Sequence, residues 1–125
     1  MQTRTIGPVT VSAIGLASVQ NEFSPAFRTS GGELEHCAAA GIAFLPWSPL
    51  GGTGRAAHLG RWHAAFGEIA AARGVSPRRV TLAWMLAKAP VVIPIPGASR
   101  PESIIDSAQA PGLTLTPEEL ARLDA

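Results

Sequence analysis

The segment Gly51-Gly52-Thr53-Gly54 is a weak signal for phosphate binding, because backbone N–H groups in such a stretch can hydrogen-bond phosphate oxygens. Taken alone, this glycine stretch is typical of a flexible loop. Arg100 stands just before the helix predicted to start at Pro101, and an arginine there is typical of a solvated surface.

The sequence is poor in side chains that transfer protons or bind metals. It contains no tyrosine, and Lys88 is its single lysine, on a helix predicted to be buried. The three histidines, His36, His58 and His63, have no metal-ligand spacing with Cys37. We therefore expect surface or loop histidines and no metal site.

The composition excludes several classes of partner. Hydrophobic residues make up 46% of the 125 residues, charged residues only 15%, and the formal net charge is +1. No stretch gathers five or six basic residues, which disfavours nucleic acid as a partner. Prolines interrupt the apolar windows that a membrane helix would need. The single cysteine and the lack of a visible export signal predict a cytoplasmic location.

The length and the apolar pattern together predict an incomplete α/β fold in one domain. About 250 residues are needed for a closed eight-unit β/α barrel, roughly twice this chain. Apolar runs alternate with helical patterns, as in a parallel sheet joined by right-handed helical crossovers. We expect strands at 10–16, at 18–23 (or as a continuation of the first) and at 42–45, with a helix between Ser30 and Gly41.

The second half of the chain predicts four helices and a further strand. Trp62, Phe66, Ile69 and Ala70 recur at helical spacing, which predicts one helix that ends at Gly74 with these side chains in a core or an interface. Residues 91–95 lack polar alternation, as expected of a parallel strand covered on both faces. We expect three further helices. The first starts at Ser76-Pro77, stops at Pro90 and is largely buried. The second runs from Pro101 through Gln109, and the third runs from the Thr116–Glu119 capping box to the terminus.

Three segments resemble one known family. They are Val19-Gln20-Asn21-Glu22-Phe23-Ser24-Pro25, Leu45-Pro46-Trp47-Ser48-Pro49-Leu50-Gly51-Gly52 and Ile93-Pro94-Ile95-Pro96-Gly97-Ala98-Ser99-Arg100. In this order they resemble the aldo-keto reductases. Residues 18–125 look like the last three βα units of that barrel with its C-terminal helix, and residues 1–17 look like its N-terminal hairpin and first strand. The resemblance implies a partial, half TIM-type β/α barrel with parallel strands and outer helices.

The resemblance also implies an incomplete catalytic site. Members of the family use an Asp, a Tyr, a Lys and a His on early strands, and the Tyr is the general acid that protonates the carbonyl oxygen. These positions fall in a segment that this chain lacks, so we expect no catalytic residue in it. General acid catalysis typically contributes about 10²–10⁴-fold in rate, so the isolated chain should lack ordinary reductase turnover.

The cofactor side of the family site is better preserved, and NADP(H) is the implied cofactor. By resemblance, Gln20 would bind the nicotinamide carboxamide and Trp47 would stack on the nicotinamide ring, although Gln20 can also satisfy backbone groups and Trp47 can also serve packing. The other implied contacts are Ser48, Leu50 and Gly51 for the pyrophosphate, Gly97, Ser99 and Arg100 for the 2′-phosphate, and Asp106 and Ser107, in place of the usual Glu and Asn, for the adenine.

A half-barrel would leave two sheet edges and an apolar interior uncovered. We therefore expect a homodimer or a higher homo-oligomer in which copies cover each other's sheet. Three functions remain open: a non-catalytic cofactor-binding or assembly half-barrel, an NADPH-dependent carbonyl oxidoreductase active only with a complementing chain or a substitute acid such as His63, and an interaction module with no ligand.

Overall fold

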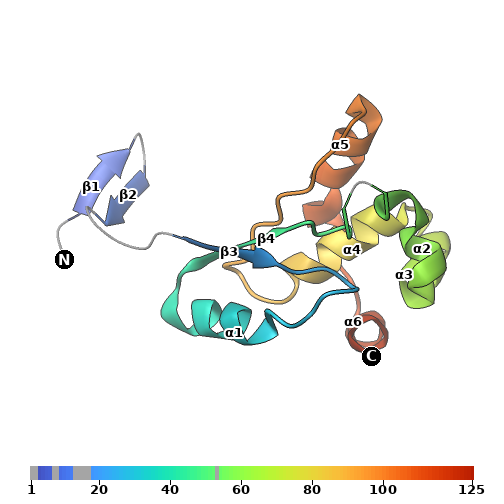
Figure 1. Cartoon of the computed structure of the whole chain (residues 1–125), viewed down its shortest axis with the longest axis horizontal. Helices are drawn as coiled ribbons and strands as arrows, with labels where there is room; N and C mark the ends of the chain where they lie inside the picture. Colours follow the sequence, from blue (N-terminus) through green and yellow to red (C-terminus); the bar gives the residue numbers. More distant parts are fainter. Residues whose placement is uncertain (1–2, 7–8, 13–17, 53) are drawn as a thin grey trace.

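A computed structural model of the chain describes residues 3–6, 9–12, 18–52 and 54–125 (Figure 1). The chain begins with an antiparallel pair of strands, β1 (Thr3–Ile6) and β2 (Val9–Ser12). The strand expected at 10–16 starts one residue earlier, and residues 13–17 lie outside the described part. The helices, in chain order, are α1 (Gly31–Ala40), η1 (Ala56–His58), α2 (Leu59–Trp62), α3 (Ala64–Arg73), α4 (Pro77–Leu86), α5 (Pro101–Ala108), η2 (Ala110–Gly112) and α6 (Pro117–Asp124).

A parallel pair of strands forms the second sheet of the described chain. Strand β3 (Ser18–Glu22) pairs with β4 (Ala43–Trp47), and α1 connects them, as the apolar pattern predicted. Helix α1 ends at Gly41, whose left-handed φ of 67° is tolerated without strain by glycine. Because partners in a parallel ladder point to the same face, Val19 and Phe44 lie on one face, and Gln20 and Leu45 lie on the other.

Residues 91–95 lie beside β4 without forming a regular strand, which corrects the prediction of one. The backbone N–H of Ile93 donates to Phe44 O at 2.9 Å, and that of Ile95 donates to Pro46 O at 3.2 Å, so the parallel placement is right. Only Val92 forms a bridge to Phe44. Pro94 and Pro96 have no N–H, so the outer edge of this segment cannot donate ladder bonds.

One face of this segment is open, which contradicts the expectation that both faces are covered. Val92 is 4% exposed, whereas Ile93 is 52% and Ile95 is 41% exposed. Alternate residues of an extended segment point to opposite faces. Within the part of the chain that the structure describes, the core helices pack on the Val92 side alone, which leaves the isoleucines uncovered.

Helix α4 is the centre of the hydrophobic core, against α2, α3 and α5. It begins as predicted, with Ser76 as N-cap accepting from Arg79 N–H and with Pro77 in the first turn. All residues from Val80 to Met85 are buried, so the prediction of a largely buried helix is confirmed. It ends at Leu86, four residues before the expected stop at Pro90, so Lys88 lies in the following turn rather than on the helix.

The single helix predicted around Trp62 is wrong, because the chain breaks at His63 into α2 and α3. His63 has φ −128° and ψ 82°, outside the helical region. Phe66 and Ile69 are buried as expected, but Trp62 is 58% exposed. The break folds α2 back on α3 so closely that a Cβ on Gly67 would lie 2.7 Å from the Gly60 carbonyl oxygen. Two glycines therefore make this sharp turn of helices possible.

Helices α5 and α6 confirm their predicted starts. Helix α5 begins at Pro101 and is capped at Gln109. At α6, Thr116 Oγ1 accepts from the Glu119 N–H at 3.2 Å, and the Thr116 N–H donates to Glu119 Oε2 at 2.8 Å, which is the predicted capping box.

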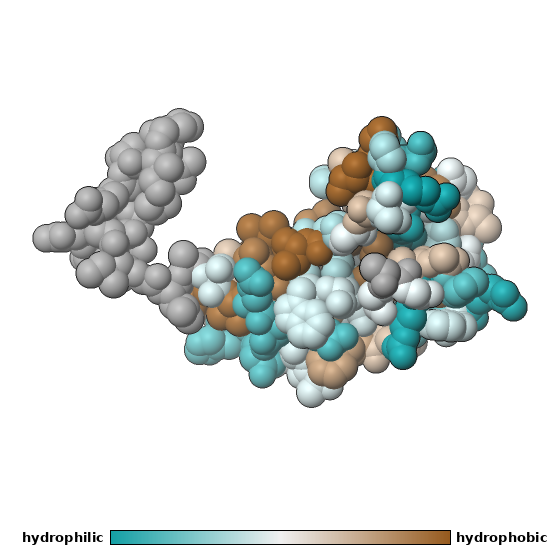
Figure 2. Space-filling model, turned by 45° about the horizontal axis from the view of Figure 1, so that its top comes forward, coloured by the Kyte–Doolittle hydropathy of each residue, from teal (hydrophilic) through white to brown (hydrophobic). Residues whose placement is uncertain are grey.

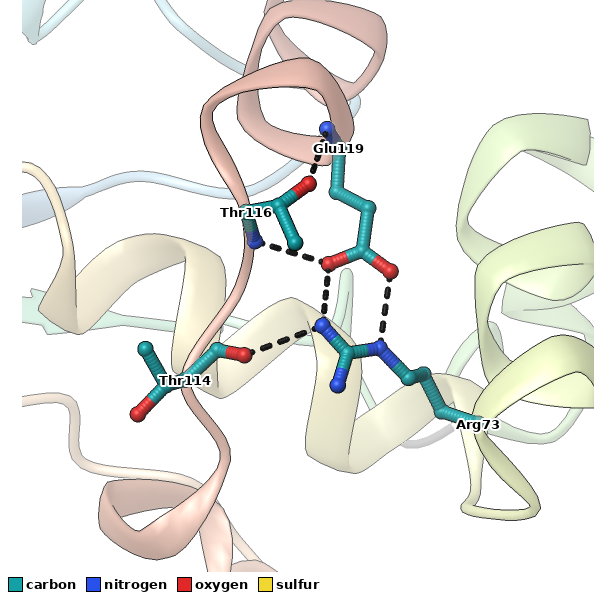
Figure 3. A network of polar contacts seen from close by, with 4 residues as sticks. All are labelled: Arg73, Thr114, Thr116 and Glu119. Atoms are coloured by element: carbon teal, nitrogen blue, oxygen red, sulfur yellow. Dashed lines mark hydrogen bonds and ion pairs between the residues drawn. The ribbon is translucent and has the colours of Figure 1, made fainter.

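The same carboxylate joins α6 to α3 (Figure 3). Arg73, the last residue of α3, donates through Nε to Glu119 Oε1 at 2.8 Å and through Nη2 to Oε2 at 2.6 Å. A third bond from Arg73 reaches Thr114 O at 3.1 Å. The hydrogen bond from Arg73, followed by that from the Thr116 backbone, lowers the pKa of Glu119 to about 2.

We expect Glu119→Gln to reduce the free energy of unfolding at pH 7 by about 1 kcal/mol. The substitution removes an exposed ion pair and weakens a helix cap, and together these interactions typically contribute about that much. Because the folded-state pKa of Glu119 lies below its ordinary value of 4.5, this stabilisation is present above about pH 4.5 and is lost as the pH falls toward 2. Urea denaturation from pH 7 to pH 3 measures it. Glu118→Gln, in the same helical turn, is the control, and a gap between wild type and Glu119→Gln that stays constant over this range would contradict the prediction.

Candidate functional site

A groove opens at the carboxyl ends of β4 and of residues 91–95. It consists of two adjoining hollows of about 170 Å³ and about 360 Å³ that share Ala56 and Gly97. The smaller hollow is lined by Ser48, Pro49, Leu50, Gly52, Ala56 and Gly97. The larger is lined by Ala56, Ala57, Arg78, Gly97, Ala98, Ser99, Arg100 and Ser103. In β/α barrels the carboxyl ends of the strands are where ligands bind.

A tight turn after β4 forms one wall of the groove. Ser48, Gly51 and Gly52 have positive φ angles of 49°, 81° and 89°, and the Gly51 N–H donates to Ser48 O at 2.8 Å. Glycine suits the position of Gly51 mainly through its positive φ, and a Cβ there would also make a tight contact, 3.3 Å, with the Cβ of Arg55. Of the residues of this turn, Gly52 lines the smaller hollow without a side chain, beside Ser48, Pro49 and Leu50.

The larger hollow lies between the amino-terminal ends of α4 and α5. Arg100 is the exposed N-cap residue of α5, and Ser103 is buried in its first turn. Arg78 lies in the first turn of α4, and its Nε is buried without a hydrogen-bond partner among the described residues. Sequence reasoning missed Arg78 and Ser103. The signal for Arg78 was a cation in a first helical turn, where the helix dipole disfavours positive charge.

The structure brings most of the predicted cofactor residues to this groove or beside it. Ser48, Leu50, Gly97, Ser99 and Arg100 line it, and Gly51 lines an adjoining small pocket that shares Leu50.

Gln20 and Trp47 lie on the open face of the sheet. Gln20 pairs in register with Leu45, two residues before Trp47, so both side chains leave the same face. Both are exposed, Trp47 by 43%. Trp47 directly precedes Ser48 in the groove wall. An aromatic ring and an amide therefore share one face of the sheet, and neither residue lines the two hollows.

Asp106 and Ser107 do not line either hollow. The Asp106 carboxylate accepts from Arg79 Nε at 3.0 Å, from Arg79 Nη2 at 2.6 Å and from the Ser76 hydroxyl, which ties α5 to the start of α4. The Ser107 hydroxyl is buried and donates to Ser103 O at 2.9 Å. Their adenine contact stays a prediction.

The other titratable groups near the site are engaged or poorly suited to donating a proton. Burial and, secondarily, the charge of Arg28 lower the pKa of His63 below its ordinary value of 6.5, so the neutral imidazole dominates at pH 7. Lys88 forms an ion pair with Asp124 and lies over the ring of Trp84. Among the described residues, no group of three or more His, Cys, Asp or Glu side chains could hold a metal ion. No helix in the described part of the chain has the length and apolar character needed to cross a membrane.

Parallel strands joined by helices, with a groove at their carboxyl ends, define a TIM-barrel-like α/β protein, and known structures agree. The chain is similar to a thermostable aldo-keto reductase crystallised with the inhibitor epalrestat, at 28% identity and a TM-score of 0.77 over 90% of this chain and 40% of that one. It is also similar to an aldo/keto reductase of Klebsiella pneumoniae in complex with NADP and acetate, at 29% identity and a TM-score of 0.76 over 86% and 38%.

Sequence comparison places the chain in a family. The profile of the Aldo/keto reductase family matches residues 6–125, so the chain belongs to that family. It is 35% identical over 109 residues to an uncharacterized oxidoreductase of Schizosaccharomyces pombe and 33% identical over 109 residues to pyridoxine 4-dehydrogenase of Escherichia coli. These alignments cover 87% of the chain and 34% and 36% of the two relatives, so the chain spans about a third of their length.

Proposed function

We propose that this chain binds NADP(H) in the groove between β4, α4 and α5 and that, by itself, it is a cofactor-binding half-barrel without reductase turnover. The observation that carries the proposal is the continuous groove at the strand ends, with a glycine turn at one end and two arginines at the other. A dinucleotide phosphate needs an aromatic or apolar platform, backbone donors and a cationic end. Similar proteins of Klebsiella pneumoniae were crystallised with NADP and with NADPH.

The residues present fit the parts of this cofactor. Trp47 offers a ring for stacking, and Gln20 offers an amide on the same face for the nicotinamide carboxamide. The turn at Ser48–Gly52 suits the pyrophosphate because its two glycines carry no side chain that would keep an anion from the backbone N–H groups. The cationic hollow near Arg100 suits the 2′-phosphate.

Bound NADPH would supply a hydride, and reduction of a carbonyl also needs a proton donor. This chain has no tyrosine. Lys88 is paired with Asp124, and the lowered pKa of His63 favours the neutral imidazole, so neither replaces that acid well. We infer that binding is retained without turnover.

Titration of NADPH fluorescence against the purified protein tests the proposal. We expect saturable binding that Trp47→Ala weakens about two- to ten-fold, because aromatic stacking contributes about 0.5–1.5 kcal/mol beyond the area it buries. Phe27→Ala is the control, since Phe27 is an aromatic side chain of similar exposure, 38%, that lines neither the groove nor the adjoining pocket. The absence of binding at millimolar NADPH, or equal losses in the two variants, would contradict the proposal.

The open sheet face supports a proposed homo-oligomer that completes the half-barrel. Figure 2 shows hydrophobic residues gathered beside the sheet and again on α5. The sheet face that carries Leu45, Trp47, Ile93 and Ile95, of which Trp47, Ile93 and Ile95 are 43%, 52% and 41% exposed, we call the open face. So much apolar surface is stabilised by contact with another protein surface, and a second copy supplies an identical face.

A second candidate is a carbonyl oxidoreductase assembled from this chain and a complementing chain. The two relatives are about three times as long, so a complete barrel contains further βα units that would cover the open face. NADPH consumption that appears only when this chain is mixed with a chain carrying those units would favour it. An unchanged oligomer with no NADPH binding would instead favour an interaction module.

A further inference from the structure

Trp47 lies between two neighbours on the open face. On β3, Glu22 is its partner in the parallel ladder. On the other side, the bridge between Phe44 and Val92 sets the register of the adjacent segment, and this register places Ile95 beside Trp47. Trp47 is 43% exposed and Ile95 is 41% exposed, so the two side chains form one apolar surface that the described residues leave half open.

The open face suits a second copy of this chain because it carries very little charge. Its outward positions on β3, β4 and residues 93–95 are Ser18, Gln20, Glu22, Ala43, Leu45, Trp47, Ile93 and Ile95. Glu22 is the one charged residue among them. In a two-fold contact the same surface meets itself, so a face with many like charges would repel its copy, whereas this face would bury apolar side chains.

The edge of the sheet favours contact through its face. Pro94 and Pro96 leave the outer edge of the segment at 91–95 without N–H donors at these positions, which disfavours addition of a further strand there. The exposed isoleucines, Ile93 and Ile95, lie on the face and not along that edge. A second copy therefore packs on the side chains of the open face, with Trp47 in the contact.

The proposed site of the nicotinamide ring uses the same side chain. In that site the phosphates of the cofactor lie in the groove, and the ring stacks on Trp47, which lines neither hollow. A stacked ring occupies the layer about 3.5–4 Å above the indole, and the atoms of a packed protein surface lie at the same separation. The exposed part of Trp47 therefore has room for one of the two.

We propose that binding of NADP(H) and self-association through the open face are mutually exclusive, so that the cofactor controls the oligomeric state of this chain. This inference rests on the proposed function. Two partners that compete for one surface are negatively coupled, and the coupling is reciprocal. The cofactor releases the second copy, and the second copy lowers the affinity for the cofactor. The residues of the groove are not on the open face, so the phosphates take no part in this competition.

Light scattering with two ligands tests the exclusion. We expect saturating NADPH to shift the molar mass of wild type from that of an oligomer to that of a single chain. The matched control ligand is 2′-phospho-ADP-ribose, which keeps the phosphates and lacks the nicotinamide ring. It should bind in the groove and leave the mass unchanged. Isothermal titration calorimetry establishes that each ligand is bound.

NADPH titrations at two protein concentrations test the reciprocal effect. Where about nine in ten wild-type chains are associated, the apparent dissociation constant should be about ten-fold higher than in dilute protein, because one chain in ten is competent to bind. Ile93→Asp, which carries a charge on the open face, should bind NADPH with the lower constant at both concentrations. Ile105→Asp is the matched control, because Ile105 is similarly exposed on α5, and it should behave as wild type.

The outcomes separate this inference from the proposed function. An oligomer that binds NADPH and keeps its mass, or an affinity equal at the two protein concentrations, would overturn the exclusion and leave cofactor binding intact. A wild type that is a single chain at all concentrations would do the same. Release by 2′-phospho-ADP-ribose would show that the nicotinamide ring is not the competitor and overturn the role of Trp47. If neither wild type nor Ile93→Asp binds NADPH, the proposed function fails and the exclusion fails with it.

Discussion

Replacing Trp84 with alanine should lower the free energy of unfolding by about 3–5 kcal/mol, the range of a buried aromatic side chain removed from a core. Trp84 is fully buried. Its ring stacks on Phe23 at 5.5 Å with an interplanar angle of 12°, and it meets Phe66 edge-on at 5.5 Å. One side chain of α4 therefore joins the end of β3 to α3.

Polar contacts of the same indole add to the expected loss. Its Nε1–H donates to Asp124 Oδ1 at 2.7 Å, which ties α4 to the last residue of α6. The Arg28 guanidinium and the Lys88 ammonium lie 4.9 Å and 4.7 Å from the ring, within the range of cation–π attraction. Domains are usually stable by only about 5–15 kcal/mol, so this variant should be close to unfolding at 37 °C.

Urea denaturation followed by circular dichroism measures this loss. Trp62→Ala is the control, because it deletes the same side chain at a position that is 58% exposed, and it should change stability by less than about 1 kcal/mol. Trp84→Phe separates the two contributions, since it keeps much of the packing and removes the hydrogen bond to Asp124. Similar losses for Trp84→Ala and Trp62→Ala would show that the core is not organised around α4.

Introducing charge on the open face should dissociate the proposed oligomer. We expect Ile93→Asp to shift the molar mass in light scattering from that of an oligomer to that of a single chain. An unpaired carboxylate buried in an apolar contact is destabilising by several kcal/mol, and in a symmetric dimer each substitution acts twice. Within one chain the effect should be small, because Ile93 is 52% exposed.

Ile105→Asp provides the comparison for this experiment. Ile105 is 58% exposed, similar to Ile93, but it lies on α5 and not on the open face. It should leave the mass unchanged. A wild-type chain that remains monomeric at all concentrations, or equal effects of the two variants, would refute assembly through the sheet.

Local sequence signals correctly predicted the starts of α4 and α6 and the ends of α1 and α3, because these boundaries depend on bonds between near neighbours. Ser76-Pro77 and the Thr116–Glu119 capping box act within one turn. Gly41 and Gly74 end α1 and α3 through left-handed φ angles that the residue type itself favours. Such signals need no knowledge of the rest of the chain.

The irregular segment at 91–95 and the exposure of Trp62 were not predicted, for different reasons. Apolar periodicity describes which side chains avoid water and does not record whether a partner surface exists, so Ile93 could not be placed on an open face. The helix break at His63 depends on how closely α2 packs on α3, through Gly60 and Gly67.

For the site, the sequence by itself determined the family and most residues of the groove. The three short segments that resemble the family also contain most of the residues that line the groove. The tertiary structure alone decided which of two adjacent arginines forms an ion pair among the described residues. Arg79 and Asp106 are 27 residues apart and meet because α5 packs on α4, which leaves Arg78 facing the hollow. Pairing between charges on different elements depends on the distance and angle between those elements, and only the folded chain sets them.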